Sequence, residues 1–193
     1  MASTKKRRTR RPAGQERELH ALHAFETSFG WVAATWMRGR LDCLAFGYRT
    51  PKLAVTAVRS KAGEVDEVSE LGDEARRFAD RLRAYFEGRS DSFLDIPISL
   101  DCTTEFQRKV LGYCRQIPYG QTRSYAELAR AAGSPNACRA VGNIMARNRI
   151  PLIIPCHRVV GSHGSLGGYS APSGLSLKRQ LLRLEGAECS LRT

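Results

Sequence analysis

Apolar and aromatic residues are dense between residues 25 and 58, and their pattern favours extended structure. The stretches 25–37 and 41–48 are rich in aromatic and small apolar side chains, which predicts strands. Arg38-Gly39-Arg40 separates the two stretches and is typical of a hairpin turn. A third strand is expected over residues 53–58.

Residues 71–87 change to helical spacing. Apolar side chains recur there every three or four positions, at Leu71, Ala75, Phe78, Leu82 and Tyr85. Gly88 follows as a typical helix end. Strands followed by a helix predict a small α/β domain over residues 18–100, in which we find no catalytic motif.

The second half contains three signals for the start of a helix. Thr104 with Gln107 and Ser124 with Glu127 each form a capping-box pattern, and the helix after Ser124 is expected to end at Gly133. Ser134-Pro135 offers an N-cap and an N1 proline for a further helix that runs to about residue 147. Two short helices joined by a tight turn predict a helix-turn-helix, a pattern that many helical hairpins share.

The last of these helices has two distinct faces. Val141, Ile144 and Met145 form an apolar stripe that Asn148 continues at helical spacing, so Asn148 is expected to point inward and to need partners. The opposite face offers an amide and two cations to solvent or phosphate: Arg139, Asn143 and Arg147.

Charge is distributed unevenly along the chain. The 193 residues are 42% hydrophobic and carry a net charge of +12. The length fits one ordinary domain or two small ones, and the chain contains no apolar run of membrane-spanning length. Residues 1–12 hold six Lys or Arg and no acid, and residues 100–193 hold 13 against five acids. This excess favours a polyanion such as nucleic acid, although a merely basic surface fits equally well. The tail, residues 1–17, is expected to be disordered and to serve as a DNA arm, a nuclear address or a plain solvated tail.

The six cysteines are scattered, with no Cys-x-x-Cys pair, so neither a zinc ribbon nor a disulfide scaffold is predicted. No apolar segment follows the basic N-terminus, so no secretory signal is predicted. We therefore expect reduced thiols in an intracellular protein of the cytoplasm, nucleoid or nucleus. We expect no metal and no cofactor.

The most distinctive segment is residues 150–160. Its apolar run, residues 152–154, lies between two prolines and is expected to be extended and buried, which would hold the following Cys156 rigidly. His157 comes next, and a thiolate is favoured by a neighbouring base or cation. In an extended segment, Cys156 and His157 point to opposite sides, so they would need a bend or a water molecule to share a proton. A buried structural cysteine is the alternative.

Together, these motifs resemble the O6-alkylguanine-DNA alkyltransferases, which are also called methylated-DNA–protein-cysteine methyltransferases. The likeness runs from about Thr104 to Gly186 and is carried by several ordered motifs: Ile117-Pro118-Tyr119-Gly120, Ser124-Tyr125, Arg139-Ala140-Val141-Gly142, Asn148, Ile154-Pro155-Cys156-His157-Arg158-Val159-Val160, Gly168-Tyr169-Ser170 and Leu184-Glu185-Gly186. Residues 18–100 resemble the family's variable N-terminal domain only in size and element order.

The resemblance implies a role for each residue of the reaction centre. Cys156 would accept the alkyl group from guanine O6, His157 would act as its base through a water, and Glu185 would orient His157. Asn148 would bridge backbone groups around the site. Tyr125 would press on the 3′ phosphate to rotate the nucleotide out of the duplex and would supply a proton to the leaving guanine.

The resemblance also implies how the lesion is presented. Arg139 would fill the vacated base stack, while the pocket would be lined by Pro151, Tyr169 and Ser170, with the carbonyls of Val159 and Cys156 reading the guanine amino group. Arg149 stands where a proline is common in the family, which is expected to loosen that turn.

We therefore expect an α+β protein with a basic tail (1–17), a small ribonuclease H-like domain (18–100) and a C-terminal domain with a winged helix-turn-helix-like motif (101–193). The expected function is single-turnover repair of O6-alkylguanine in double-stranded DNA by a monomer, with O4-alkylthymine as a second candidate substrate. Two other functions fit the sequence less well, a non-enzymatic lesion-binding protein or regulator and a cysteine hydrolase.

Overall fold

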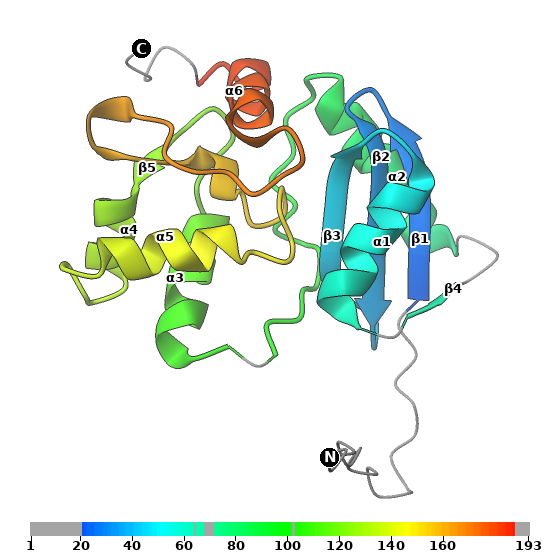
Figure 1. The fold of residues 1–193 in the computed structure, drawn as a ribbon, viewed down its shortest axis with the longest axis horizontal. Coiled ribbons are helices and arrows are strands. Elements are labelled where there is room, and N and C mark those ends of the chain that lie inside the picture. The colour runs from blue at the N-terminus through cyan, green and yellow to red at the C-terminus, as the bar shows by residue number, and fades with distance from the viewer. Residues whose placement is uncertain (1–20, 64, 68–71, 102, 188–193) are drawn as a thin grey trace, which may run out of the picture.

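The computed structural model describes residues 21–63, 65–67, 72–101 and 103–187. Figure 1 shows a sheet with its helices on one side of the molecule and a cluster of helices on the other. We call residues 21–87 the N-terminal region and residues 105–187 the C-terminal region. The basic tail lies outside the described residues. No helix in the described ranges is long and apolar enough to cross a membrane.

The N-terminal region contains a four-stranded sheet of order β3-β2-β1-β4. Its first three strands form an antiparallel meander, and β4 pairs with β1 in parallel. The sheet and its two helices comprise β1 (Ala21–Thr27), β2 (Gly30–Met37), β3 (Arg40–Tyr48), α1 (Pro51–Ala62), β4 (Asp66–Glu67) and α2 (Asp73–Phe86). The predicted turn at Arg38 and Gly39 is confirmed, and the helix predicted over 71–87 is confirmed over Asp73–Phe86, while Leu71 lies outside the described residues.

Two strand predictions were wrong in detail. Residues 53–58 lie in helix α1 because Thr50 caps it, with its side chain accepting from the Leu53 amide, and Pro51 sits at the first turn. The stretch 25–37 is broken at Ser28 and Phe29, where β1 turns into β2. Gly30 there has φ +94°, and a Cβ would lie 2.7 Å from the Tyr48 carbonyl oxygen.

The two faces of the sheet pack against different partners. One face packs on α1 through Val58 and Ala54, while the other packs on α2 through Phe78 and Leu82. The cluster on the α2 side continues into the C-terminal region through Ile150, Leu152, Ile153, Leu177 and Leu181. The two regions therefore share one hydrophobic core, which fixes their relative position.

The C-terminal region contains α3 (Glu105–Arg115), β5 (Arg123–Ser124), α4 (Tyr125–Ala131), α5 (Cys138–Ala146), β6 (Val159–Val160) and α6 (Gly174–Leu184), with short 3₁₀ turns at Cys156–Arg158 and Ser162–Gly164. Both predicted capping boxes are present, at Thr104 and at Ser124. The predicted start of α5 at Ser134 was wrong. Ser134 instead closes a turn, its carbonyl accepting from the Ala137 amide at 2.9 Å, and the helix begins four residues later.

The segment before Cys156 is buried as expected, but it is not extended. Leu152 has φ +72°, and the Ile154 amide bonds to the Ile150 carbonyl at 2.9 Å, so the chain turns here. Cys156, His157 and Arg158 then form the first 3₁₀ turn. Cys156 and His157 therefore lie on a turn and not on the extended segment that the sequence predicted.

Candidate active site

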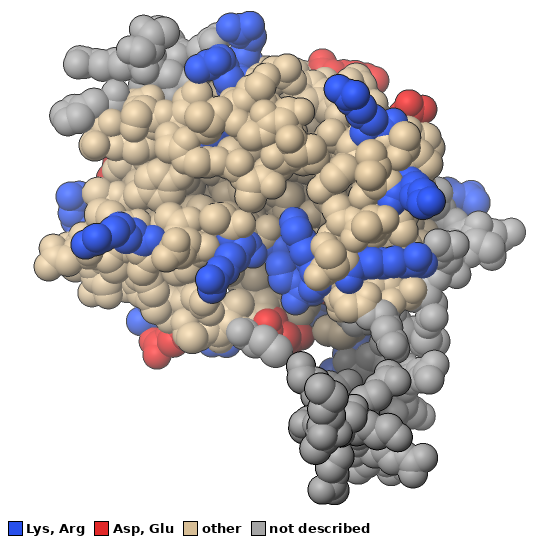
Figure 2. Space-filling model, in the orientation of Figure 1, with Lys and Arg blue, Asp and Glu red and all other residues tan. Residues whose placement is uncertain are grey.

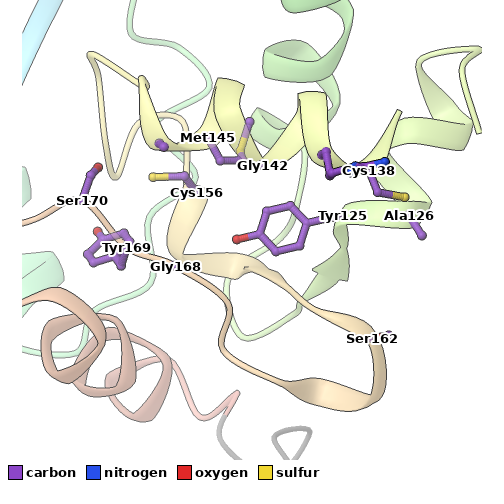
Figure 3. A pocket seen from close by; sticks show the side chains of 12 residues that line it. Tyr125, Ala126, Cys138, Gly142, Met145, Cys156, Ser162, Gly168, Tyr169 and Ser170 are labelled. Atoms are coloured by element: carbon purple, nitrogen blue, oxygen red, sulfur yellow. The ribbon is translucent and has the colours of Figure 1, made fainter. Parts of the chain in front are cut away.

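Cys156 lies at the wall of a cavity of about 610 Å³ between α4, α5 and the loop after β6. In Figure 3, Tyr125 points toward the thiol from the start of α4, while Tyr169 and Ser170 lie on its other side. The cavity is lined by Tyr125, Ala126, Cys138, Arg139, Gly142, Met145, Ala146, Cys156, Ser162, Gly168, Tyr169 and Ser170. The thiol is thus placed where a flat, partly apolar ligand can reach it.

His157 and Glu185 are paired beneath the cavity. His157 Nε2 lies 2.9 Å from Glu185 Oε1, and both side chains are completely buried. Burial alone would raise the pKa of Glu185, but the hydrogen bonds and charges of His157 and Arg158 lower it to about 2. The carboxylate therefore stays ionised and accepts the proton on Nε2, which leaves Nδ1 as the basic nitrogen of a neutral imidazole.

The free nitrogen of His157 has the properties of a local base. Nδ1 is buried and makes no hydrogen bond to any described residue. Burial lowers the pKa of His157, while Glu185 opposes that shift, so the ring is neutral at physiological pH. Burial also raises the pKa of the Cys156 thiol, against the opposing effects of Asn148 and the charge of Lys178. The resting pair is a thiol and a neutral imidazole.

Asn148 holds the turn that leads to Cys156. Its Nδ2 donates to the Ile154 carbonyl at 2.8 Å, and its Oδ1 accepts from the Ile150 amide at 3.0 Å. Asn148 is 6% exposed, as its inward position on the helix predicted. Arg149 does not loosen the turn as expected, because its carbonyl accepts from the Leu44 amide at 2.8 Å and its Nη2 bonds to Asp42 at 3.1 Å.

Two further predicted pocket residues, Pro151 and Val159, lie outside the lining of the main cavity. Pro151 lies in a recess that adjoins the cavity and is shared with Cys156, Tyr169 and Ser170. Val159 is fully buried, and its carbonyl accepts from Lys178 Nζ at 2.5 Å. A carbonyl oxygen has a second lone pair, so this bond leaves Val159 able to accept from a ligand.

Three buried residues of the site were not predicted from the sequence. Arg158 donates to both carboxylate oxygens of Glu185 and to the Ile117 carbonyl. Lys178 is fully buried, which lowers its pKa to about 8. Tyr85 reaches Glu185 from α2. Lys178 falls on the apolar stripe of α6 together with Leu177, Leu181 and Leu182, and a charge in such a stripe was a signal that could have been used.

Helix α5 presents the predicted polar face to solvent. Arg139, Asn143 and Arg147 are exposed, whereas Val141 and Met145 are buried. Arg139 lines the Cys156 cavity, but Asn143 and Arg147 line a different groove on the other flank of α5. The face seen in Figure 2 shows more Lys and Arg than Asp and Glu, which suits a polyanion.

Comparison with known proteins agrees with this geometry. The family described as "6-O-methylguanine DNA methyltransferase, DNA binding domain" matches residues 105–187. A methylated-DNA–protein-cysteine methyltransferase of Methanosarcina acetivorans is 47% identical over 112 residues, which are 58% of this chain and 69% of that one. The Mycobacterium leprae protein of the same name is 50% identical over 54% of this chain and 61% of its own.

Two solved structures share the fold across both regions. The Mycobacterium tuberculosis OGT in complex with DNA has a TM-score of 0.69 at 30% identity and covers 90% of this chain and 99% of its own. The O6-methylguanine-DNA methyltransferase of Pyrococcus kodakaraensis has a TM-score of 0.65 at 26% identity, with 87% and 99% covered.

The fold and the matched family define a DNA-binding α+β protein whose C-terminal region places Cys156 beside a cavity. The chain belongs to the methylated-DNA–protein-cysteine methyltransferase family. The function that the sequence predicted, repair of alkylated DNA by transfer of an alkyl group to a cysteine, is confirmed at this level.

Proposed function

We propose that Cys156 is the acceptor and that its substrate is O6-alkylguanine in double-stranded DNA. The observation that carries this assignment is the place of Cys156, at the wall of the cavity and directly before the buried His157–Glu185 pair. The thiolate attacks the alkyl carbon in line, a carbon–sulfur bond forms, and the carbon–oxygen bond breaks with its electron pair going to guanine O6. The thioether is not turned over, so each molecule acts once.

The proton of the thiol leaves through His157. Nδ1, which has no partner in the described part of the chain, takes the proton through a water molecule. Glu185 stabilises the imidazolium and does not itself take the proton, because its pKa is about 2. Tyr125, whose hydroxyl side faces Cys156 in Figure 3, donates a proton to the leaving guanine.

The pocket positions the flipped base. Tyr169 and Ser170 line the cavity with Cys156, and Pro151 closes the adjoining recess. The carbonyls of Val159 and Cys156 accept from the guanine amino group, and Asn148 keeps the Cys156 turn rigid through its two backbone bonds. O4-alkylthymine is a further substrate that this arrangement admits.

DNA is held by α5 and by general electrostatics. Arg139, at the mouth of the cavity, fills the space that the flipped base leaves, and Asn143 and Arg147 contact the backbone. Such contacts make affinity dependent on salt and independent of sequence, which suits a protein that must search all DNA.

Each of the two domains has a fold of its own in this proposal. The N-terminal domain (18–100) is ribonuclease H-like, supported by an antiparallel β3-β2-β1 meander with β4 parallel to β1. The C-terminal domain (101–193) carries a winged helix-turn-helix-like motif, supported by α4 and α5 joined through a tight turn. We propose a monomer that works inside the cell, where its DNA substrate lies.

Intact mass and peptide mapping test the acceptor. After incubation with a duplex that contains O6-methylguanine, the protein is expected to gain one methyl group on Cys156, with guanine restored in equal amount. Cys156→Ala is expected to bind the duplex without gaining mass. Cys138→Ala is the matched control because Cys138 lines the same cavity, and it should be methylated on Cys156 like the wild type. A wild-type protein that binds the lesion and stays unmodified would contradict the proposal and indicate lesion recognition only.

A further inference from the structure

Tyr85 brings the N-terminal region into contact with the catalytic pair. It lies near the end of α2, is 1% exposed, and its hydroxyl donates to Glu185 Oε1. The same hydroxyl lies 3.4 Å from His157 Nε2. Because α2 belongs to the N-terminal region and both partners lie in the C-terminal region, this contact joins residues 72 and 100 positions apart.

The hydroxyl shares one carboxylate oxygen with the imidazole. Oε1 of Glu185 accepts from Tyr85 and from the Arg158 Nη2 at 2.8 Å, and it lies 2.9 Å from His157 Nε2. Oε2 accepts from the Arg158 Nε at 2.9 Å and from the Gly120 amide at 3.3 Å. A donor on Oε1 withdraws negative charge from the atom that faces the imidazole. Tyr85 therefore competes with His157 for the carboxylate.

The ring of Tyr85 is held independently of its hydroxyl. It packs edge-on against Phe86, Phe93 and Tyr119, with ring centroids 5.5, 5.7 and 5.9 Å away. Replacement by phenylalanine keeps this packing and removes one hydrogen bond. The electrostatic effect of the hydroxyl can therefore be separated from the packing of the ring.

We propose that Tyr85 is a positioning residue that sets the basicity of His157 through Glu185. This inference rests on the proposed function, in which His157 takes the proton of Cys156. Without the Tyr85 hydroxyl, Oε1 carries more negative charge toward the imidazole and stabilises its protonated form. His157 then keeps its second proton up to a higher pH, and the protonated ring cannot accept the proton of Cys156.

The other charged and titratable groups around the pair remain in place in that variant. The cations around the pair are Arg158, on the same turn as Cys156 and His157, and Lys178 on α6. The neutral groups are two phenols whose pKa burial raises, Tyr119 in the loop before β5 and Tyr169 in the loop after β6. Arg158 and Lys178 lower the pKa of His157, in the same direction as its burial. A change on removal of one hydroxyl therefore reports Tyr85 itself.

The test is the pH dependence of methyl transfer by the full chain. Tyr85→Phe is expected to move the acid limb of the rate profile to higher pH by about one unit, the size typical of a lost hydrogen bond to a charged group. The rate on the alkaline plateau should be kept. An NMR titration of the His157 ring should show the same upward shift in the absence of DNA.

Tyr119→Phe is the matched control. Its hydroxyl bonds to the carbonyls of Leu184 and Gly88, not to the carboxylate, so the acid limb should stay where it is in the wild type. A Tyr85→Phe variant that is slower at every pH, with an unmoved limb and an unmoved His157 titration, would overturn the inference and leave Tyr85 as a packing residue. A wild type that transfers no methyl group would instead sink the proposed function, and the NMR titration would still decide the role of Tyr85.

Discussion

The two regions of this protein differ in whether their sequences contain recognisable functional motifs. The C-terminal region carries the motifs, the family match over residues 105–187 and Cys156 at the wall of the cavity. The N-terminal region has no catalytic motif, yet its Tyr85 donates to Glu185 and its Asp42 accepts from Arg149, beside Asn148. A region without recognisable chemistry can therefore still determine the geometry in which the chemistry takes place.

The shared core explains how this influence is transmitted. Ile150 and Ile153, which flank the turn before Cys156, belong to the same hydrophobic cluster as Phe46 of β3 and Tyr85 of α2. The backbone joins the regions too, since the Leu44 amide bonds to the Arg149 carbonyl. Substitutions on either side of the interface between the regions should separate effects on alkyl transfer from effects on the stability of the site.

The largest effect is expected from Glu185→Ala in the C-terminal region. Arg158, which is 3% exposed, would lose its carboxylate, and a buried unpaired charge costs about 3–5 kcal/mol of unfolding free energy. His157 would lose its orientation, so transfer should become undetectable. Denaturant unfolding and single-turnover transfer measure the two effects. Glu87→Ala removes an exposed carboxylate at the end of α2 and should change neither quantity. A stable, active Glu185→Ala protein would contradict the role proposed for Glu185.

An effect confined to DNA is expected from Arg139→Ala. Arg139 is exposed and lines the cavity mouth, so its loss should slow transfer from a duplex about tenfold, because the vacated stack is no longer filled. Transfer from free O6-alkylguanine base needs no flipping and should keep its rate. The two rates are compared in the same protein, with the exposed Arg130→Ala as control. An equal loss on both substrates would contradict the assigned role.

The smallest effect, and the one that tests the supporting region, is expected from Asp42→Ala. Asp42 is 4% exposed and bonds to Thr35 Oγ1 at 2.7 Å and to Arg149 Nη2 at 3.1 Å. Its removal should cost about 1–3 kcal/mol of unfolding free energy. Transfer should slow a few-fold because Arg149 adjoins Asn148. Asp80→Ala removes an exposed ion pair on α2 and should have no effect; equal behaviour of the two variants would argue against support from this side.

The sequence predictions were most accurate where the deciding interaction joins residues close in the chain, and least accurate where it joins distant ones. The capping boxes at Thr104 and Ser124 depend on residues three positions apart, so the sequence alone located both helices. The apolar run over 53–58 fits a strand and a helix equally well, and the cap at Thr50 decided it. The left-handed Leu152 could not be foreseen, because its conformation is imposed by the core around it.

The sequence by itself predicted the residues of the candidate site. Cys156, His157, Asn148 and Glu185 lie in ordered motifs, and the helical spacing already placed Asn148 inward. Only the tertiary structure decided that Cys156 and His157 lie on one 3₁₀ turn after the bend at Leu152, and that Tyr85 bonds to Glu185. The physical reason is that a hydrogen bond between residues 100 positions apart leaves no local pattern, and it forms only when the shared core brings α2 against the end of α6.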